Sequence, residues 1–456
     1  MRSSTIALYS GPILALLAGC IMWQAGFSAP AAQTLTITVW CVIWWIFEPI
    51  PIPATSLLPL AALPLLGVID KTQLSSAYGN PLILLLLSGF LLSTALAKCG
   101  AHRRLALALV NLFGGSSSRR IVIGFMVAAA LSSMWISNTA TALMLLPIAM
   151  AVTERASDER LRVPLLLGIA YGCSIGGLGT PIGTPPNVVF MGIYEETTGN
   201  QVSFGQWMSW GIPIVAVLLP MVAWWLTRNL RGGGKIELPA QQPWSKAEVR
   251  VMAVFALTAV GWITRTEPFG GWSGALGFAY TNDAMVGFIG VFALFVFGDG
   301  KGGKLLDWET ANNIPWGILL LFAAGLAIAT AFLSSGLSNQ VGQALASTQQ
   351  LHPLVLMLVL CSAVTFITEA TSNTATTSLL LPIVAATATA AAIDPRLLMV
   401  PVAMSASCAF MLPVATPPNV IVFSTGHVPI ADMVREGFAA NLAGIIVIAG
   451  GLYLLL

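Results

Sequence analysis

Two short polar motifs each occur twice in this chain, and their side chains are suited to ion binding. The first motif reads Ser-Asn-Thr, at 137–139 and again at 372–374. The second reads Thr-Pro-Pro-Asn, at 184–187 and again at 416–419. Carbonyl, amide and hydroxyl oxygens suit a hard cation such as sodium, whereas the N–H groups at a helix N-terminus suit an anion. The four motifs could therefore hold a cation and an anion in one cavity.

The copies are separated by a nearly constant number of residues. The asparagines of the two Ser-Asn-Thr motifs are 235 residues apart, and those of the two Thr-Pro-Pro-Asn motifs are 232 apart. Gly89 and Gly325, each in an apolar stretch, are 236 apart. A single motif of this kind would be explained more simply as a helix cap or an interhelical hydrogen bond. Recurrence of both indicates an internal repeat, which is typical of secondary transporters that bind substrate where the repeats meet.

The composition of the chain is that of a membrane protein. Of its 456 residues, 57% are apolar and 8% are charged, and the mean hydropathy is +0.85. A soluble domain carries about 25% charged residues. We therefore predict an all-α polytopic protein of the lipid bilayer. The net charge of +2 and the lack of a basic patch argue against a nucleic-acid partner. No metal set or nucleophile–base pair is evident, so we do not expect an enzyme.

Hydropathy predicts about eleven spans and two helical hairpins. The spans lie near 5–27, 34–50, 54–69, 80–99, 163–194, 206–227, 250–264, 282–298, 315–335, 397–425 and 437–456. Two of these, 163–194 and 397–425, contain the Thr-Pro-Pro-Asn motifs and should be broken helices. The hairpins cover 121–152 and 353–392. Residues 101–114 and 337–350 are shorter and more polar, which predicts amphipathic helices at the membrane interface.

The polar motifs should lie where helices are interrupted. Hydrocarbon cannot satisfy free backbone groups, so interrupted helices persist only inside protein or beside a wet cavity. Each Ser-Asn-Thr motif should form the tip of a re-entrant hairpin, because these residues cap helices. Thr184 and Thr416 suit the N-cap position, and the prolines that follow suit the first helical turn.

The distribution of basic residues predicts that the two repeats are inverted. The first hairpin is flanked by Lys98, Arg103, Arg104, Arg119, Arg120, Arg155, Arg160 and Arg162. Around the second hairpin, between 334 and 399, the only basic residue is Arg396. Positive residues collect on the cytoplasmic side. We therefore expect the first hairpin to enter from the cytoplasm and the second from outside, with a cytoplasmic N-terminus and a C-terminus on the periplasmic or extracellular side.

At these paired motifs the chain resembles the divalent anion–sodium symporter family, which includes dicarboxylate and citrate carriers. The resemblance covers essentially the whole length. It implies eleven spans, two re-entrant hairpins, a homodimer and an elevator mechanism in which a transport domain slides along a scaffold domain. The scaffold would comprise 1–110 and 250–350, and the transport domain 111–227 and 351–456. The polar stretch 228–249 would link the two halves.

The resemblance also implies two sodium sites and one substrate site. The first sodium site would use Ser133, Ser137, Asn138 and the carbonyl of Gly183. The second would use Thr368, Thr371, Asn373 and the carbonyl of Ala415. The carboxylates of the substrate would meet Ser137, Asn138, Thr139, Thr184, Ser372, Asn373, Thr374 and Thr416.

The resulting functional hypothesis is sodium-coupled symport of a C4-dicarboxylate (succinate, malate or fumarate) across a bacterial inner membrane. Dicarboxylate or citrate antiport, citrate uptake and sulfate symport remain open alternatives of the same fold, and an anion channel is an alternative of another class. Glu369 is the only acidic residue close to a tip. It could stabilise the hairpin through hydrogen bonds or lend charge to a cation site, and the former is favoured.

Overall fold

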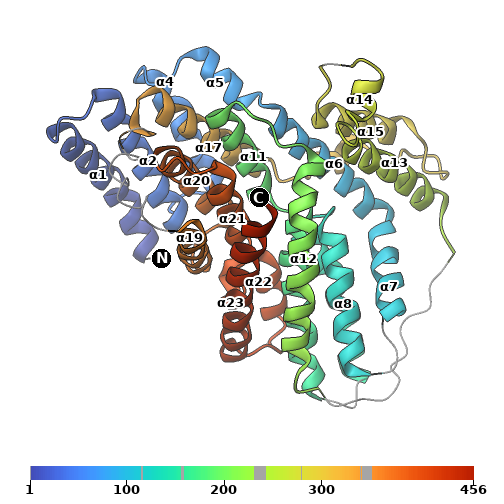
Figure 1. Cartoon of the computed structure of the whole chain (residues 1–456). Helices are drawn as coiled ribbons and strands as arrows, with labels where there is room; N and C mark the ends of the chain where they lie inside the picture. Colours follow the sequence, from blue (N-terminus) through green and yellow to red (C-terminus); the bar gives the residue numbers. More distant parts are fainter. Residues whose placement is uncertain are drawn as a thin grey trace.

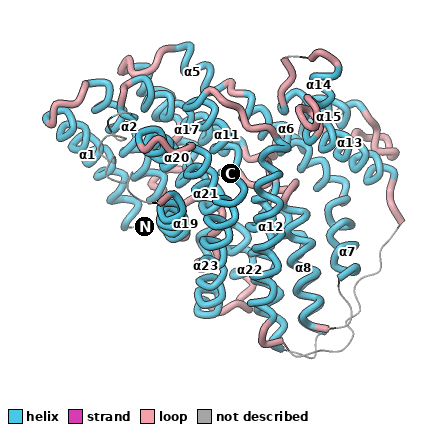
Figure 2. Tube along the Cα trace, viewed as in Figure 1, coloured by secondary structure: helices cyan, strands magenta, loops and turns pink. Residues whose placement is uncertain are grey.

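The computed structural model describes residues 2–113, 117–155, 159–230, 243–278, 280–338, 340 and 352–456. Within these ranges the chain consists of helices and connecting loops, with an isolated β-bridge between Gly298 and Lys304 (Figures 1 and 2). Seven of the described helices are long and apolar enough to cross a membrane, and five further apolar helices have 10–17 residues. The prediction of an all-α, multi-spanning protein is confirmed.

In the first half of the chain the described residues form twelve α-helices and two short 3₁₀ turns. They are α1 (Arg2–Gln24), α2 (Ala29–Phe47), α3 (Ile52–Thr55), α4 (Leu57–Leu65), α5 (Lys71–Tyr78), α6 (Pro81–Cys99), α7 (Ala101–Phe113), α8 (Ser118–Ser133), α9 (Asn138–Arg155), η1 (Glu159–Leu161), α10 (Arg162–Gly176), η2 (Gly177–Gly179), α11 (Pro185–Thr198) and α12 (Phe204–Thr227).

The described helices of the second half follow a similar order. They are α13 (Lys246–Ile263), α14 (Gly271–Ala275), α15 (Asp283–Val296), α16 (Trp308–Ala311), α17 (Trp316–Ser334), α19 (Pro353–Thr368), α20 (Asn373–Ala390), α21 (Pro395–Ala406), η4 (Pro413–Ala415), α22 (Pro417–Phe423) and α23 (Ile430–Leu455).

The helices are interrupted where the polar motifs predict. Residues 134–137, here called the first tip, separate α8 from α9, and residues 369–372, the second tip, separate α19 from α20. Residues 177–184, the first break, separate α10 from α11, and residues 407–416, the second break, separate α21 from α22. Thr184 and Thr416 are N-caps followed by proline in the first turn, as expected.

The predicted span at 54–69 differs in detail. The chain forms the short helix α3 and then α4, which meet at Ser56, and α4 ends at Leu65. Proline and glycine account for the two ends: the first turn of α3 contains proline, and after α4 Gly67 adopts a positive φ of 71°. The N–H groups of Gly67 and Val68 then donate to the carbonyl oxygens of Pro64 and Leu63, which ends the helix in a Schellman motif. A further short helix, α5, follows before α6.

Helices of the two halves are packed against one another around the tips and breaks. Within each half, α10 contacts α8 and α21 contacts α19. Across the halves, α11 contacts α20 and α21, while α22 contacts α9 and α10. The long helices α12 and α23 lie side by side (Figure 1). All four interruptions therefore belong to one packed group of helices.

The remaining helices lie on either side of this group. Helices α1 and α2 pack together at one end of the molecule, and α13 packs with α15 and α6 at the other (Figure 1). Helix α17 contacts α4 and α5 as well as α11 and α20. Helix α7 occupies the first predicted interfacial segment, whereas nearly all of the second, 337–350, lies outside the described residues.

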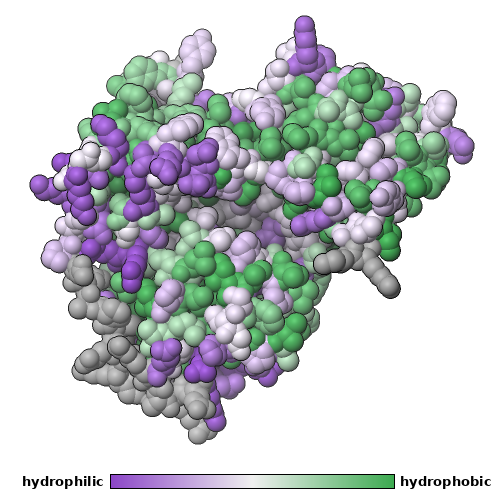
Figure 3. Space-filling view, turned by 180° about the vertical axis from the view of Figure 1, so that it is seen from behind, coloured by the Kyte–Doolittle hydropathy of each residue, from purple (hydrophilic) through white to green (hydrophobic). Residues whose placement is uncertain are grey.

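The outer surface is largely apolar. Figure 3 shows broad connected areas of hydrophobic residues on one face of the molecule. Ile6, Ile13 and Leu17 of α1, and Ile289 and Phe292 of α15, are each more than half exposed. Surfaces of this kind are stable when lipid or another subunit covers them, which agrees with the apolar composition.

Candidate cation and dianion site

The first tip is ordered around an asparagine. The hydroxyl group of Ser133, at the end of α8, donates a hydrogen bond to Oδ1 of Asn138, at the start of α9. The hydroxyl oxygen of Ser137 accepts from the N–H of Ala140, 3.2 Å away, and so caps α9. Three of the predicted first-site residues are therefore linked to the tip by hydrogen bonds. The bond from Ser133 holds the Asn138 side-chain amide in a defined orientation.

The first break is closed by a second asparagine. The side-chain amide of Asn187 donates to the carbonyl oxygens of Gly177 and Thr180, both at 2.8 Å. Asn187 is fully buried, and it ties the end of α10 to the start of α11 across the interruption. Free backbone groups inside an apolar protein are costly, so this side chain makes the broken helix possible.

The first tip and the first break meet at Gly177. A methyl group built on this glycine would lie 3.4 Å from Asn138 Oδ1 and 3.2 Å from the carbonyl oxygen of Gly183. On Gly183 itself, a methyl group would lie 2.5 Å from the Gly177 carbonyl oxygen. The structure thus brings Asn138, Gly183 and the N-cap Thr184 together, and glycine is required for this close approach.

The second half repeats the hydrogen bonds of the two asparagines. Thr368, five residues before Asn373, donates its hydroxyl hydrogen to Asn373 Oδ1 at 2.7 Å. Asn419 donates to the carbonyl oxygens of Ala409 and Leu412 at 3.1 and 3.0 Å. These acceptors are ten and seven residues before the asparagine, as in the first half. The asparagines of the two copies therefore make equivalent contacts, whereas the caps differ: Ser137 accepts from a backbone N–H in the first half, and Thr416 does so in the second.

The two breaks also contact each other. The hydroxyl of Ser407 in the second break donates to the hydroxyl oxygen of Thr184 in the first break, at 3.4 Å. Thr184 and Thr416 are 4% and 3% exposed. Asn138 and Asn373 are only half buried, and Ser137 is exposed. Both threonines are thus buried, whereas the tip residues remain partly accessible.

The remaining predicted residues are placed less centrally. The Thr371 hydroxyl interacts with Thr376 Oγ1 at 2.6 Å and with the Ile367 carbonyl at 3.0 Å, so both of its hydrogen bonds stay within its own hairpin. Ser372 is the N-cap of α20, Thr139 is half buried, and Thr374 and Ala415 are buried. No described hydrogen bond joins these residues to the Thr368–Asn373 pair.

Glu369 stabilises the second tip and the second break. Its Oε1 atom accepts from the N–H groups of Phe410 and Met411, at 2.7 and 2.9 Å, and from Asn441 Nδ2 at 2.7 Å. Its Oε2 atom accepts from the N–H groups of Met411 and Leu412, at 3.1 and 3.0 Å. The favoured prediction, a bracing function, agrees with these contacts.

Sequence reasoning missed the corresponding contacts of the first half. There the Thr180 hydroxyl donates to the carbonyl oxygen of Met134 in the first tip. Trp207 of α12 donates through Nε1 to the Leu178 carbonyl at 2.9 Å. The position of Thr180, directly after a glycine-rich helix end, was the available signal for its contact with the tip. Nothing in the sequence identifies Trp207 as the donor to the Leu178 carbonyl.

The donor set suits a hard cation. The region offers hydroxyl, amide and carbonyl oxygens, and among the described residues no group of three or more His, Cys, Asp and Glu could hold a metal ion. The buried Oδ1 atoms of Asn187 and Asn419 have no hydrogen-bond partner. Buried acceptors of this kind are normally satisfied by water or an ion.

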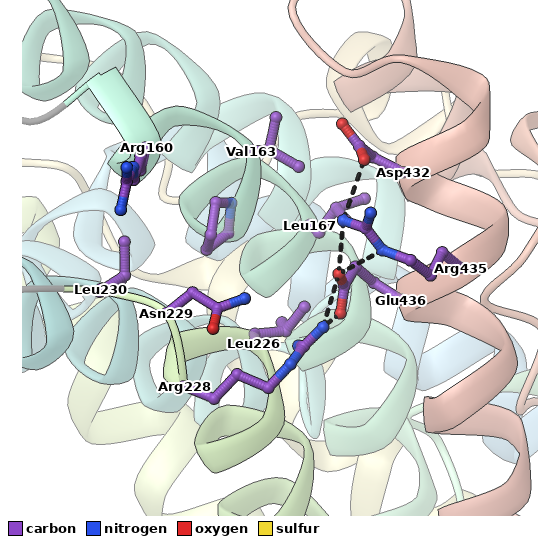
Figure 4. Close-up of a pocket in the computed structure, with 11 residues that line it drawn as sticks. Arg160, Val163, Leu167, Leu226, Arg228, Asn229, Leu230, Asp432, Arg435 and Glu436 are labelled. Atoms are coloured by element: carbon purple, nitrogen blue, oxygen red, sulfur yellow. Dashed lines mark hydrogen bonds and ion pairs between the residues drawn. The ribbon is translucent and has the colours of Figure 1, made fainter.

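A separate cavity of about 540 Å³ lies at the end of α12 and the start of α23. None of the motif residues lines it. Figure 4 shows Arg228 and Arg435 directed toward Glu436, with N–O distances of 2.7 and 3.0 Å, and Arg435 also bonded to Asp432. This network ties the two long helices together rather than forming part of the ion site.

Comparisons with known proteins identify the family. The sequence profile of the family described as citrate transporter (CitMHS) matches residues 42–400. The sodium-dependent dicarboxylate transporter SdcS of Staphylococcus saprophyticus is 39% identical over 480 residues, which cover 99% of this chain and 91% of that protein. The chain belongs to the divalent anion–sodium symporter family. The SdcS protein of Staphylococcus aureus is also similar, with 38% identity over 97% of this chain and 89% of its own.

A solved structure shows the same fold. The YdaH transporter of Alcanivorax borkumensis matches with a TM-score of 0.63, over 92% of this chain and 98% of its own, at 15% identity. The resemblance inferred from the paired motifs is confirmed, as is the prediction of a membrane transporter rather than an enzyme.

Proposed function

We propose that this transporter carries out sodium-coupled symport of C4-dicarboxylates such as succinate, malate and fumarate. The observation that carries the proposal is the doubled arrangement of a hydroxyl group bonded to the amide oxygen of an asparagine, Ser133 to Asn138 and Thr368 to Asn373. Each lies beside a broken helix. The names of the two SdcS relatives support the substrate class and the coupling ion.

The chemistry of the motifs explains why transport would depend on sodium. None of the tip or break motifs contains a lysine or arginine. A dianion held there is compensated by helix N-termini, hydroxyl and amide groups, and bound sodium. Without the cation the dianion binds weakly, so the two ligands favour each other's binding. This reciprocal effect is the thermodynamic basis of symport.

The proposal includes the residue assignment that the family resemblance implies. The first sodium ion is assigned to Ser133, Ser137, Asn138 and the Gly183 carbonyl. The second is assigned to Thr368, Thr371, Asn373 and the Ala415 carbonyl, with Thr371 contributing its carbonyl, because its hydroxyl is engaged elsewhere. The dianion would lie between the tips, in contact with Ser137, Asn138, Thr139, Ser372, Asn373, Thr374, Thr184 and Thr416.

The larger-scale proposals concern assembly and orientation. We place the transporter in a bacterial inner membrane with its N-terminus in the cytoplasm and its repeats inverted, because of the basic residues around the first hairpin. The exposed apolar surface of the helices is consistent with a homodimer in lipid. The packed group that contains both tips and both breaks would be the mobile transport domain.

Uptake of labelled succinate into proteoliposomes tests the proposal. An inward sodium gradient should drive accumulation, whereas potassium alone should not. Equal accumulation in potassium would contradict symport. Stimulation by internal dicarboxylate, without sodium, would identify an exchanger, and saturable uptake rules out a simple channel.

Citrate is the second candidate substrate, because the family that matches residues 42–400 is described as citrate transporter. Competition distinguishes the possibilities: a dicarboxylate carrier should be inhibited by malate and fumarate at lower concentration than by citrate. Stronger inhibition by citrate would make citrate the preferred substrate, and inhibition by sulfate alone would indicate a sulfate symporter.

A further inference from the structure

Four acidic side chains are buried in the described part of the chain, and Glu369 differs from the other three. The others are each paired with arginine: Glu248 with Arg104, Glu436 with Arg228 and Asp283 with Arg265, at N–O distances of 2.9, 2.7 and 2.5 Å. Glu369 is 4% exposed, and none of the ion pairs found among the described residues includes it.

The carboxylate of Glu369 is surrounded by hydrogen-bond donors. All five hydrogen bonds come from donors: the backbone N–H groups of residues 410–412 and the amide of Asn441. A carboxylate is an acceptor only, whereas a protonated carboxyl group must also donate. The arrangement therefore suits a negative charge. The four groups that donate to this buried carboxylate are neutral, so their dipoles stabilise it, and no cationic side chain of the described residues forms an ion pair with it.

Glu369 is adjacent in the chain to a residue of the second proposed sodium site. Glu369 directly follows Thr368, whose hydroxyl contacts Asn373 Oδ1 at 2.7 Å and the Ala406 carbonyl at 2.9 Å. A buried charge acts over a greater distance than one in water because the surrounding dielectric constant is low. A sodium ion at the second site would therefore compensate Glu369.

The first half lacks an equivalent charge. The residue after Ser133 is Met134, which offers only its carbonyl oxygen, to the Thr180 hydroxyl. The two sodium sites thus share their ligand chemistry but differ by one buried negative charge.

We propose that Glu369 is a positioning residue whose charge makes the second site bind sodium more tightly than the first. The inference rests on the sodium sites of the proposed function. Glu369 acts through its charge and not as a ligand, since both of its oxygens are already occupied, Oε1 by three donors and Oε2 by two.

Two variants separate charge from bracing. Glu369→Gln removes the charge, and Asn441→Ala removes one neutral donor to the same carboxylate while the charge stays. For Glu369→Gln, the sodium concentration for half-maximal succinate uptake should rise about tenfold or more, the size of effect that a neighbouring charge has on an ionisable group. Maximal uptake should recover at saturating sodium. Asn441→Ala should change the sodium requirement by about twofold at most.

A binding measurement keeps the inference independent of transport. Sodium that binds the folded protein raises its melting temperature, so the purified transporter is heated in increasing sodium, with potassium as control. The sodium dependence should shift for Glu369→Gln and be largely restored in Glu369→Asp, which keeps the charge even if the Gln variant folds poorly. Equal shifts in Glu369→Gln and Asn441→Ala would overturn the charge mechanism. Sodium-dependent stabilisation without sodium-dependent uptake would instead contradict the proposed symport.

Discussion

The two breaks are built from equivalent residues but are stabilised by different groups. In both, an asparagine side chain donates to two carbonyl oxygens across the interruption. The first break is then tied to its tip by the neutral hydroxyl of Thr180, and the second by the carboxylate of Glu369. The two halves therefore keep the same asparagine hydrogen bonds while the charge beside them differs. Those hydrogen bonds would fix the positions of the proposed sodium ligands, whereas the affinity for sodium would also depend on the nearby charge.

A second difference concerns the space beside each site. The first half has glycine at 177 and 183, whereas the corresponding residues of the second half, 232 positions later, are Ala409 and Ala415. At the first proposed site the backbone of Gly183 approaches that of Gly177 closely. A methyl group on Gly183 would lie 2.5 Å from the Gly177 carbonyl oxygen. The second site tolerates methyl groups. The halves are thus similar in hydrogen bonds and different in packing.

The largest expected effect tests the part that the halves share. Asn138→Ala and Asn373→Ala should each reduce uptake at least about a hundredfold, because each removes a proposed ligand oxygen and the acceptor of the neighbouring hydroxyl. Uptake in proteoliposomes gives the activity, and size-exclusion chromatography checks that the oligomeric state is unchanged. If either variant kept the wild-type dependence on sodium, the assignment of that asparagine would be wrong.

The asparagines of the breaks should be equally important in both halves. Asn187→Ala and Asn419→Ala each remove a buried amide and leave two carbonyl oxygens unsatisfied, a loss of about 2–4 kcal/mol. Thermal unfolding in detergent measures the change, and substitution of the exposed Asn200 provides a control for handling. A loss confined to one variant would show that the two breaks are not equivalent.

The positions of the tips and breaks could be predicted from the sequence better than the contacts that stabilise them. Apolar stretches and polar motifs were sufficient to place both tips and both breaks, because a helix inside a membrane can be interrupted only where polar residues cap its ends. The N-cap positions of Thr184 and Thr416 followed from the prolines behind them. These are local properties, and local properties can be read from a sequence.

Contacts between distant residues were not predictable in the same way. Trp207 reaches Leu178, and Asn441 reaches Glu369 from a helix 72 residues further along the chain. Both side chains lie in long apolar helices, where a single polar atom gives no indication of its partner. Thr371 is predicted to belong to the second sodium site, but the bonds of its hydroxyl to Thr376 and Ile367 depend on the rotamer that the hairpin backbone imposes.

Exchange of the small residues should sharpen the contrast in packing. Gly183→Ala gives the first half the residue found in the second, yet it should weaken sodium activation of uptake about tenfold, because the added methyl group collides with backbone. The reverse change, Ala415→Gly, serves as the matched control and should alter activation by about twofold at most, since only a methyl group is lost. Similar effects of both changes would show that the two sites are equally confined.

The smallest effect should come from the neutral tie of the first half. Thr180→Val keeps the shape of the side chain but removes the hydroxyl that donates to the Met134 carbonyl. A neutral interhelical hydrogen bond in a membrane protein contributes about 1 kcal/mol, so unfolding should shift slightly while the sodium concentration for half-maximal uptake stays within about twofold. Thr180→Ser, which retains the donor, should behave like the wild type. If Thr180→Val raised the sodium requirement as much as Glu369→Gln does, the charge of Glu369 would no longer distinguish the two halves. The contacts of Thr180 and Glu369 would then both act by holding the backbone of the tip and the break in place.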